Sequence, residues 1–233
     1  MTTLILDGSG PYAVVALSNE HGEVLSSVIF EASRTLSTRL FAQIEAVLSV
    51  AGLTKSDLMS LAVGTGPGSF TGVRIALTTF RTMAQVNGLP LVGISTLDAY
   101  AEPLLPLSHE RPVVAVLYSR RNEVYVSVYK DGKRVGDAVA ETIEAVRQRI
   151  AGLALSGGGV FLCGRTETVG DAPGALRITQ RWPAPDSLAR LAAMRLTAGE
   201  ADNALALLPE YVVAPMISTP RDPSILTGSA EAR

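Results

Sequence analysis

The chain has 233 residues, of which 47% are hydrophobic and 18% are charged, and its formal net charge is -2. This composition supports a sizeable core in one large or two small domains and excludes a chain that is disordered overall. The near-neutral charge argues against strong nucleic-acid binding by the chain alone, because such binding depends on clustered basic residues.

Cysteine and histidine are too few to suggest a metal site or a nucleophile. Cys163 is the single cysteine, which excludes an intramolecular disulfide, and it follows the apolar run GVFL, which predicts a buried and unreactive thiol. His21 and His109 lie in turn-like contexts and form no H-x-x-x-H pair. We therefore expect no catalytic residue, no metal and no cofactor.

The N-terminal region does not have the pattern of a targeting signal. It lacks a basic start, and Asp7 interrupts its short apolar run. The sequence also contains no apolar run of about eighteen residues, the length that a membrane span needs. We expect a cytoplasmic protein without membrane contact.

Three β-rich runs open the chain. Residues 3–7, 12–18 and 23–31 are separated by the turns GSGP and NEHG, which predicts an antiparallel meander. Apolar residues then recur at helical spacing from Leu36 to Ala51, and Gly52 is a suitable helix stop.

A glycine-rich block comes directly after an apolar strand predicted at residues 58–63. It reads GTGPGSFTGVR, from Gly64 to Arg74, and leads into a helix predicted over about residues 71–86. A turn of this kind between a strand and a helix can hold a phosphate, but neither the Walker pattern nor the dinucleotide pattern G-x-G-x-x-G fits. A tight connection, with Ser69 or Thr71 capping the helix, is the favoured interpretation.

The succession of strands, helix and strand then recurs. Residues 112–119 and the run from Glu123 read as a hairpin, 141–150 and 187–196 as helices, and 159–164 as a strand. We therefore expect an α/β fold with two similar lobes, at residues 1–103 and 104–213. The segment 214–233 is rich in Pro, Ser and Thr, and we expect a loose tail there.

Asp7, Gly8 and Ser9 end the first predicted strand and open the turn DGSG. This arrangement is similar to the phosphate loop of the actin, sugar-kinase and Hsp70 superfamily. In that superfamily the turn wraps the nucleotide phosphates and the Asp positions a metal-bound water. The resemblance implies a nucleotide-binding role, active or vestigial, for these three residues, and an ordinary β-turn is an equal alternative.

A longer resemblance extends in order over nearly the whole chain. The segment GTGPGSFTGVRIALTTFRTMAQVNGLPLVGISTLDAYA resembles the G-x-G-P-G-S-F-T-G-x-R-x-G block of the TsaB (YeaZ) family. SRRNEVYVSVY resembles the family segment DARRGEVY, and LPEYV resembles P-x-Y-L-R. The chain departs from the family pattern in its first strand, which ends LDGSG, and at Leu36, Ala76, Tyr118 and Val213. These departures put a small-ligand contact in the second lobe in doubt.

The resemblance implies an actin-like fold, with two similar lobes that each have a mixed sheet flanked by helices. It also implies a non-catalytic subunit that binds and supports TsaD in threonylcarbamoylation of the tRNA adenosine next to the anticodon. Further partners implied are a TsaE-like ATPase and tRNA, both through the complex, and a second copy of the chain when TsaD is missing. The alternative is an ATP-dependent small-molecule kinase of the same superfamily.

The family binds its partner through the first two helices. Helices that are apolar on more than one side are either buried or covered by a partner. For each apolar residue of these two helices, contact with a partner is one hypothesis and packing in the core of the chain is the alternative. We expect an interface made of Leu36, Leu40, Phe41, Ile44, Val47, Leu48, Val73, Leu77, Phe80 and Met83, with Phe41, Phe80 and Met83 as anchors.

The glycine block would then aim the second helix at the partner. This helix-start motif consists of Gly66, Pro67, Gly68, Ser69, Phe70, Thr71 and Gly72. Arg74 lies one turn into the helix, and we expect it to pair with an acidic group or a phosphate, the acidic group being favoured.

Overall fold

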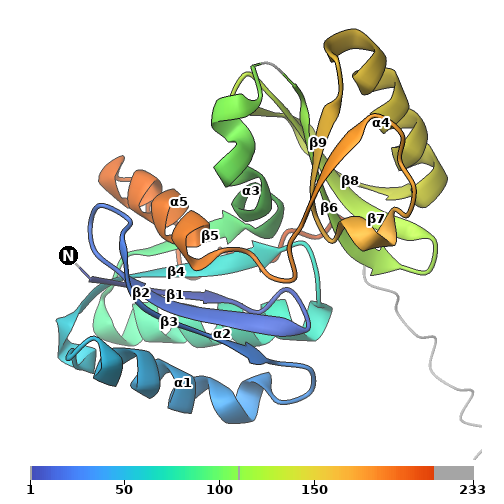
Figure 1. Ribbon diagram of the computed structural model, residues 1–233. Helices are drawn as coiled ribbons and strands as arrows, with labels where there is room; N and C mark the ends of the chain where they lie inside the picture. Colours follow the sequence, from blue (N-terminus) through green and yellow to red (C-terminus); the bar gives the residue numbers. More distant parts are fainter. Residues whose placement is uncertain (1, 110, 213–233) are drawn as a thin grey trace, which may run out of the picture.

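Two five-stranded mixed sheets form the framework of the computed structural model, which describes residues 2–109 and 111–212 (Figure 1). Each sheet is the centre of one lobe. Val213 and the tail predicted at 214–233 lie outside the described residues.

The first sheet begins with the predicted antiparallel meander. Its strands β4 and β5 run parallel to β1, giving the order β3-β2-β1-β4-β5. The strands are β1 Thr2–Asp7, β2 Tyr12–Ser18, β3 Val24–Glu31, β4 Leu58–Gly66 and β5 Leu91–Ser95. The helical segments among them are α1 Leu36–Val50, η1 Lys55–Asp57 and α2 Phe70–Asn87. The predicted strands and helices of this part of the chain are confirmed.

The second sheet repeats the strand order of the first, as β10-β9-β6-β7-β8. Again three antiparallel strands precede two that run parallel to the first of them. The strands are β6 Val113–Arg120, β7 Glu123–Lys130, β8 Lys133–Thr142, β9 Val160–Gly164 and β10 Ala175–Thr179. The prediction of two similar lobes is therefore confirmed, although β10 was not predicted. Residues 141 and 142 were predicted as helix and belong instead to the end of β8.

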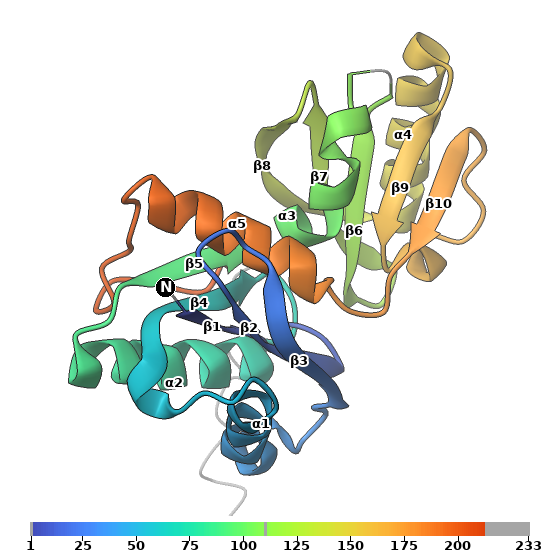
Figure 2. The same ribbon diagram turned by 60° about the vertical axis from the view of Figure 1, so that its left-hand side comes forward.

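Helices cover both faces of each sheet. Helices α1 and α2 lie on one face of the first sheet and α5 on the opposite face, as Figures 1 and 2 show from two sides. Helix α3 packs against the second sheet on the face opposite α4. The helical segments are α3 Thr96–Ala101, η2 Glu102–Leu107, α4 Ile143–Gly157, η3 Thr166–Thr168 and α5 Pro185–Thr197.

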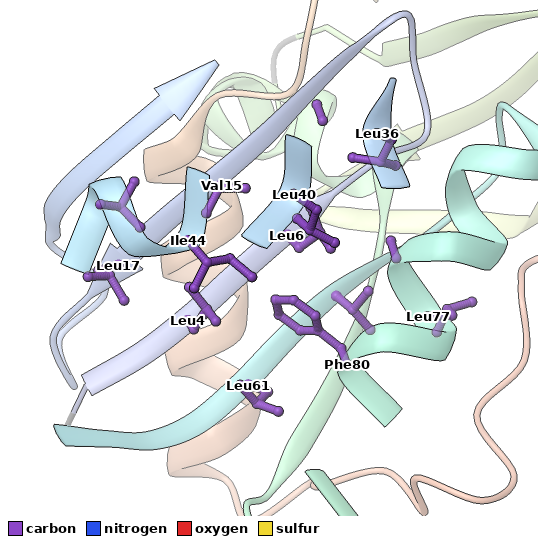
Figure 3. Close-up of a cluster of buried hydrophobic side chains, with 14 of the residues drawn as sticks. Leu4, Leu6, Val15, Leu17, Leu36, Leu40, Ile44, Leu61, Leu77 and Phe80 are labelled. Atoms are coloured by element: carbon purple, nitrogen blue, oxygen red, sulfur yellow. The ribbon is translucent and has the colours of Figure 1, made fainter. Parts of the chain in front are cut away.

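Alternate residues of the central strands enter different cores, because successive side chains of a strand point to opposite faces. Leu4 and Leu6 of β1 pack with α1 and α2, whereas Ile5 packs with α5. Figure 3 shows Leu40, Ile44 and Phe80 directed from the two helices toward the sheet. This explains why β1 is a nearly continuous apolar run instead of an alternating one.

The chain returns to the first lobe after the second sheet. Helix α5 packs on the first sheet, and Asp202 pairs with Leu91 at the β5 edge in an isolated antiparallel bridge. Residues of the second predicted lobe, 104–213, thus contribute to the first lobe. The boundary between residues 103 and 104 stays a prediction.

Within the described part of the chain, no helix combines the length and the hydropathy that a membrane crossing requires.

Candidate partner-binding face and interlobe cleft

The glycine block connects β4 to α2 and packs on the turn between β1 and β2. The Ser69 side chain accepts a hydrogen bond from the Gly72 N–H at 3.2 Å, so Ser69 is the helix cap, one of the two predicted alternatives. The Ser69 N–H donates to the Ser9 carbonyl at 2.6 Å. The block is therefore fixed to the DGSG turn by the backbone itself.

Three glycines of the block are required by close approach. A Cβ added at Gly64 would lie 2.1 Å from Oδ2 of Asp7, and one at Gly72 would lie 2.1 Å from the Gly8 carbonyl oxygen. At Gly68 it would lie 2.2 Å from the Ser9 carbonyl oxygen. The spacing of the glycines therefore matches the contour of the turn against which they pack.

Asp7 is fully buried beneath this turn. Its Oδ1 accepts hydrogen bonds from the N–H and the Oγ of Ser9 at 3.0 and 2.6 Å, and its Oδ2 accepts one from Oγ1 of Thr96 at 2.8 Å. Burial raises the pKa of Asp7, while the three hydrogen bonds oppose this shift. The carboxyl group thus ties the end of β1 to the start of α3.

Thr96 was not among the predicted site residues. The signal for it is topological: β5 runs in the same direction as β1, so the residue after β5 lies at the same edge of the sheet as Asp7. Sequence spacing alone could not give this relation, because it depends on the strand order.

A cleft of about 720 Å³ lies between the lobes above the turn. Gly8 and Ser9 line this cleft. Both lobes also contribute hydroxyl, aromatic and guanidinium groups to its lining, among them those of Arg34, Tyr118, Tyr125 and Arg165. Arg165 forms an ion pair with Glu167. Such a lining could hydrogen-bond an anionic group, and the nucleotide-binding role of Asp7, Gly8 and Ser9 stays a prediction.

Most of the residues predicted for the partner interface are core residues. Eight of the ten are at most 3% exposed: Leu36, Leu40, Ile44, Val47, Leu48, Val73, Leu77 and Phe80. They pack against the first sheet and are not available on the surface of the chain, so the expectation that they form a contact surface is corrected here. The periodic apolar stripe marks the buried face of an amphipathic helix.

The outward sides of α1 and α2 carry small and apolar residues beside a few charged ones, among them Glu45, which pairs with Lys55. Phe41 is 59% exposed and Met83 is half-buried. The same outward sides also carry Ala42, Ala46, Ile75, Thr78 and Thr82, all exposed or half-buried. We call this set, with Phe41 and Met83, the α1/α2 face.

Phe41 lies on the side of α1 that faces α2. Arg39, two residues earlier and hence on the other side of the helix, stacks over the ring of Phe30 in β3, with its guanidinium carbon 5.2 Å from the ring centroid. The side of α1 that carries Arg39 therefore faces β3, and the opposite side, which carries Phe41, faces α2.

Among the described residues, Arg74 does not have the acidic partner that we expected. Its Nε donates to the hydroxyl of Tyr211 at 3.0 Å, and its guanidinium carbon lies 3.8 Å from the centroid of the Phe70 ring. The partner comes from 137 residues further along the chain, in the LPEYV segment. A phenol and an aromatic ring thus take the place of the predicted carboxylate.

Cys163 is buried in the second sheet, as predicted. Burial raises the pKa of its thiol to about 12, which keeps it protonated and weakly nucleophilic near neutral pH. Within residues 2–109 and 111–212, no three His, Cys, Asp or Glu side chains gather as a metal site would require.

Two lobes with the same strand order and a hairpin turn at the cleft define an actin-like α/β protein. A solved structure with this fold is the activator of the 2-hydroxyisocaproyl-CoA dehydratase from Clostridium difficile with bound ADPNP. It superposes with a TM-score of 0.52 over 87% of this chain and 99% of its own, at 11% identity. At that identity the likeness concerns the fold alone.

Closer relatives identify the family. A protein from Pseudomonas aeruginosa, described as similar to the peptidase YEAZ, superposes with a TM-score of 0.76 at 29% identity, over 91% of this chain and 99% of its own. The "tRNA threonylcarbamoyladenosine biosynthesis protein TsaB" of Haemophilus influenzae is 36% identical over 127 residues, which are 54% of this chain and 53% of the relative. The sequence alignment thus spans about half of that curated relative.

The sequence model of the family "TsaD: tRNA N6-adenosine threonylcarbamoyltransferase" matches residues 24–162, more than half of the chain. The chain belongs to this family and, within it, to the TsaB (YeaZ) proteins.

Proposed function

We propose that the chain is a non-catalytic subunit that binds and supports a TsaD-like catalytic subunit in the formation of threonylcarbamoyladenosine in tRNA. The names of the curated relatives support the pathway. The observation that carries the binding role is the α1/α2 face, where two neighbouring helices expose the apolar side chain of Phe41 and small uncharged side chains.

The α1/α2 face suits another pair of helices. Small side chains such as Ala42, Ala46 and Thr78 let helix axes approach closely, and Phe41 provides a large side chain of the kind that dominates binding energy. A stable interface of ordinary size would bury about 800 Å² on each partner. The same face could join two copies of the chain when the catalytic subunit is missing.

The glycine block has a defined part in this proposal. It holds the start of α2 against the DGSG turn through the Ser69 to Ser9 hydrogen bond. Helix α2 is thereby presented at a fixed angle to the partner. A TsaE-like ATPase and the tRNA would join through the complex, which agrees with the net charge of -2.

The names of the relatives favour this function over the ATP-dependent kinase. Calorimetry with ATP and magnesium distinguishes the two functions, since micromolar binding to the chain alone would favour the kinase.

The binding role is tested by a matched pair of substitutions, Phe41→Asp on α1 and Leu155→Asp on α4. Leu155 is 90% exposed and lies on a helix of the second lobe, so both changes place a charge at an exposed apolar position. We expect Phe41→Asp to weaken binding of the TsaD-like subunit from the same organism by at least about tenfold, because a buried, unpaired charge is costly. Leu155→Asp should bind as the wild type does.

Circular dichroism should be unchanged for both variants. Undiminished binding by Phe41→Asp would refute the α1/α2 face as the interface. The non-catalytic role has its own test: the chain alone should transfer no threonylcarbamoyl group to tRNA. Addition of a TsaD-like subunit, a TsaE-like ATPase and TsaC, the enzyme that makes the threonylcarbamoyl adenylate, should give activity. Measurable transfer by the chain alone would overturn that role.

A further inference from the structure

Glu210 lies where the end of the described chain passes between the two lobes. Its N–H donates to the Thr65 carbonyl at 2.8 Å, and its Oε2 accepts from the Ser95 Oγ at 2.7 Å, so it is held to β4 and β5 of the first lobe. Its Oε1 accepts from Arg134 of β8 at 2.7 Å. One residue therefore bonds to both sheets.

Arg134 is the centre of the polar network on the side of the second lobe. It also lies 3.5 Å from Asp98 of α3, and Asp98 in turn accepts a hydrogen bond from the Tyr129 hydroxyl at 2.6 Å. The side chains of Arg134 and Glu210 are 23% and 26% exposed, so solvent screens their attraction less than that of a surface pair. Among the described residues, Nε of Arg134 is buried without a hydrogen-bond partner.

Tyr211, the next residue, makes a different contact. Its hydroxyl accepts from Nε of Arg74 at 3.0 Å, and its ring centroid lies 6.0 Å from that of Phe70. Phe70 and Arg74 belong to the first turns of α2. Adjacent residues thus hold the two lobes together and hold the start of the helix that supplies half of the α1/α2 face.

We propose that Glu210 and Tyr211 form a clasp that couples the angle between the lobes to the position of the first turn of α2. Because the peptide between them is short and both side chains are engaged, movement of β8 away from the first lobe pulls on the contact with Arg74. The part of this inference that concerns partner binding rests on the proposed function. If the chain has that function, a partner that binds better to one position of α2 also favours one angle between the lobes. In turn, a change in the angle between the lobes alters the affinity for the partner by the same factor.

The clasp is tested first by the distance between the lobes in the chain alone. Spin labels at Ser49→Cys on α1 and Leu155→Cys on α4 report this distance, and the buried Cys163 stays unlabelled. We expect Glu210→Gln and Arg134→Met each to broaden or shift the distance distribution, and the double variant to add no further change. Glu200→Gln is the control. It removes a surface ion pair with Arg195 in the segment before Glu210 and should leave the distance distribution unchanged.

The second measurement is hydrogen exchange of the amides of residues 72–74 in the same proteins. Glu210→Gln does not alter any contact of α2, yet we expect it to speed this exchange at least tenfold, as should Tyr211→Phe. A lobe distance that does not respond to either Glu210→Gln or Arg134→Met would overturn the clasp. A distance that changes while exchange at residues 72–74 stays at the wild-type rate would overturn the coupling.

Arg134→Met removes the same ion pair with Glu210 by a change in the second lobe, so it decides the outcome if Glu210→Gln folds poorly. Both measurements use the chain without a partner. If both effects are observed and the chain does not bind a TsaD-like subunit, the clasp is supported and the proposed function is refuted.

Discussion

The two lobes share one strand order and differ in the segment that comes after the fourth strand of each sheet. In the first lobe, β4 leads through the glycine block into the 18-residue helix α2. In the second, β9 leads into the three-residue helix η3 and then to β10. The first sheet therefore has a layer of two neighbouring helices on one face, whereas α4 packs on the corresponding side of the second sheet. A repeated topology thus produces two different outer surfaces.

The turn between the first two strands of the sheet also differs between the two lobes. Asp7 of the first lobe is buried and accepts three hydrogen bonds, and the glycine block packs over its turn. The turn between β6 and β7 instead has a surface ion pair, with Nε of Arg120 2.7 Å from Glu123. The glycine block and the buried carboxyl group therefore belong together, as parts of one connection that positions α2.

The largest effect should come from truncating the core beneath α2. Phe80 is 0% exposed, and Phe80→Ala should lower the free energy of unfolding by about 4 kcal/mol, because it leaves a cavity between helix and sheet. Phe41→Ala on the neighbouring helix should change it by less than about 0.5 kcal/mol. Urea unfolding followed by fluorescence of Trp182, the single tryptophan, reports on the first lobe, whose core it contacts. Similar losses for the two variants would contradict this division into core and surface.

A smaller loss should result from closing the space that the glycine block leaves. In Gly72→Ala the new methyl group would meet the Gly8 carbonyl oxygen, a backbone atom that cannot turn aside, and we expect a loss of about 3 kcal/mol. Gly152→Ala on α4 is the matched change in the second lobe, where an added Cβ meets no atom within 4 Å. That variant should gain about 0.5–1 kcal/mol, because alanine favours a helix interior. Thermal unfolding of both proteins measures the difference, and equal effects would show that the packing at the turn is not special.

The smallest effect concerns the buried carboxyl group. Asp7→Ala leaves the three donors from Ser9 and Thr96 without their acceptor and should cost about 2 kcal/mol. Asp7→Asn keeps the shape and one acceptor oxygen, and should cost less.

The pH dependence of Asp7→Asn gives a sharper result. The folded pKa of Asp7 is raised above its ordinary value of 3.8, so the folded chain binds the proton more tightly than the unfolded chain. The contribution of Asp7 to stability is therefore greatest below about pH 3.8 and declines as the pH rises through the folded pKa. Asp7→Asn should remove this decline, which the difference between the two unfolding curves measures. Burial also raises the pKa of Asp98, but that shift is common to both proteins and cancels in the difference.

Elements with a strong local pattern could be predicted from the sequence. The meander of β1 to β3, helix α1 with its stop at Gly52, and the strand, glycine block and helix from β4 to α2 all follow from local periodicity and turn residues. β10 was missed, because the short run ALRIT has only a weak pattern. The interface residues were wrong for most positions because a periodic apolar stripe identifies the side of a helix that is buried, and not the side that a partner covers.

The sequence by itself determined the class of fold, the family and the helix-start motif, because each depends on residues that are close together in the chain. Only the tertiary structure decided that Thr96 meets Asp7 and that Arg74 meets Tyr211. Those relations join residues 89 and 137 positions apart. They depend on the order of strands in the sheet and on the return of the chain across both lobes, neither of which is encoded in local spacing.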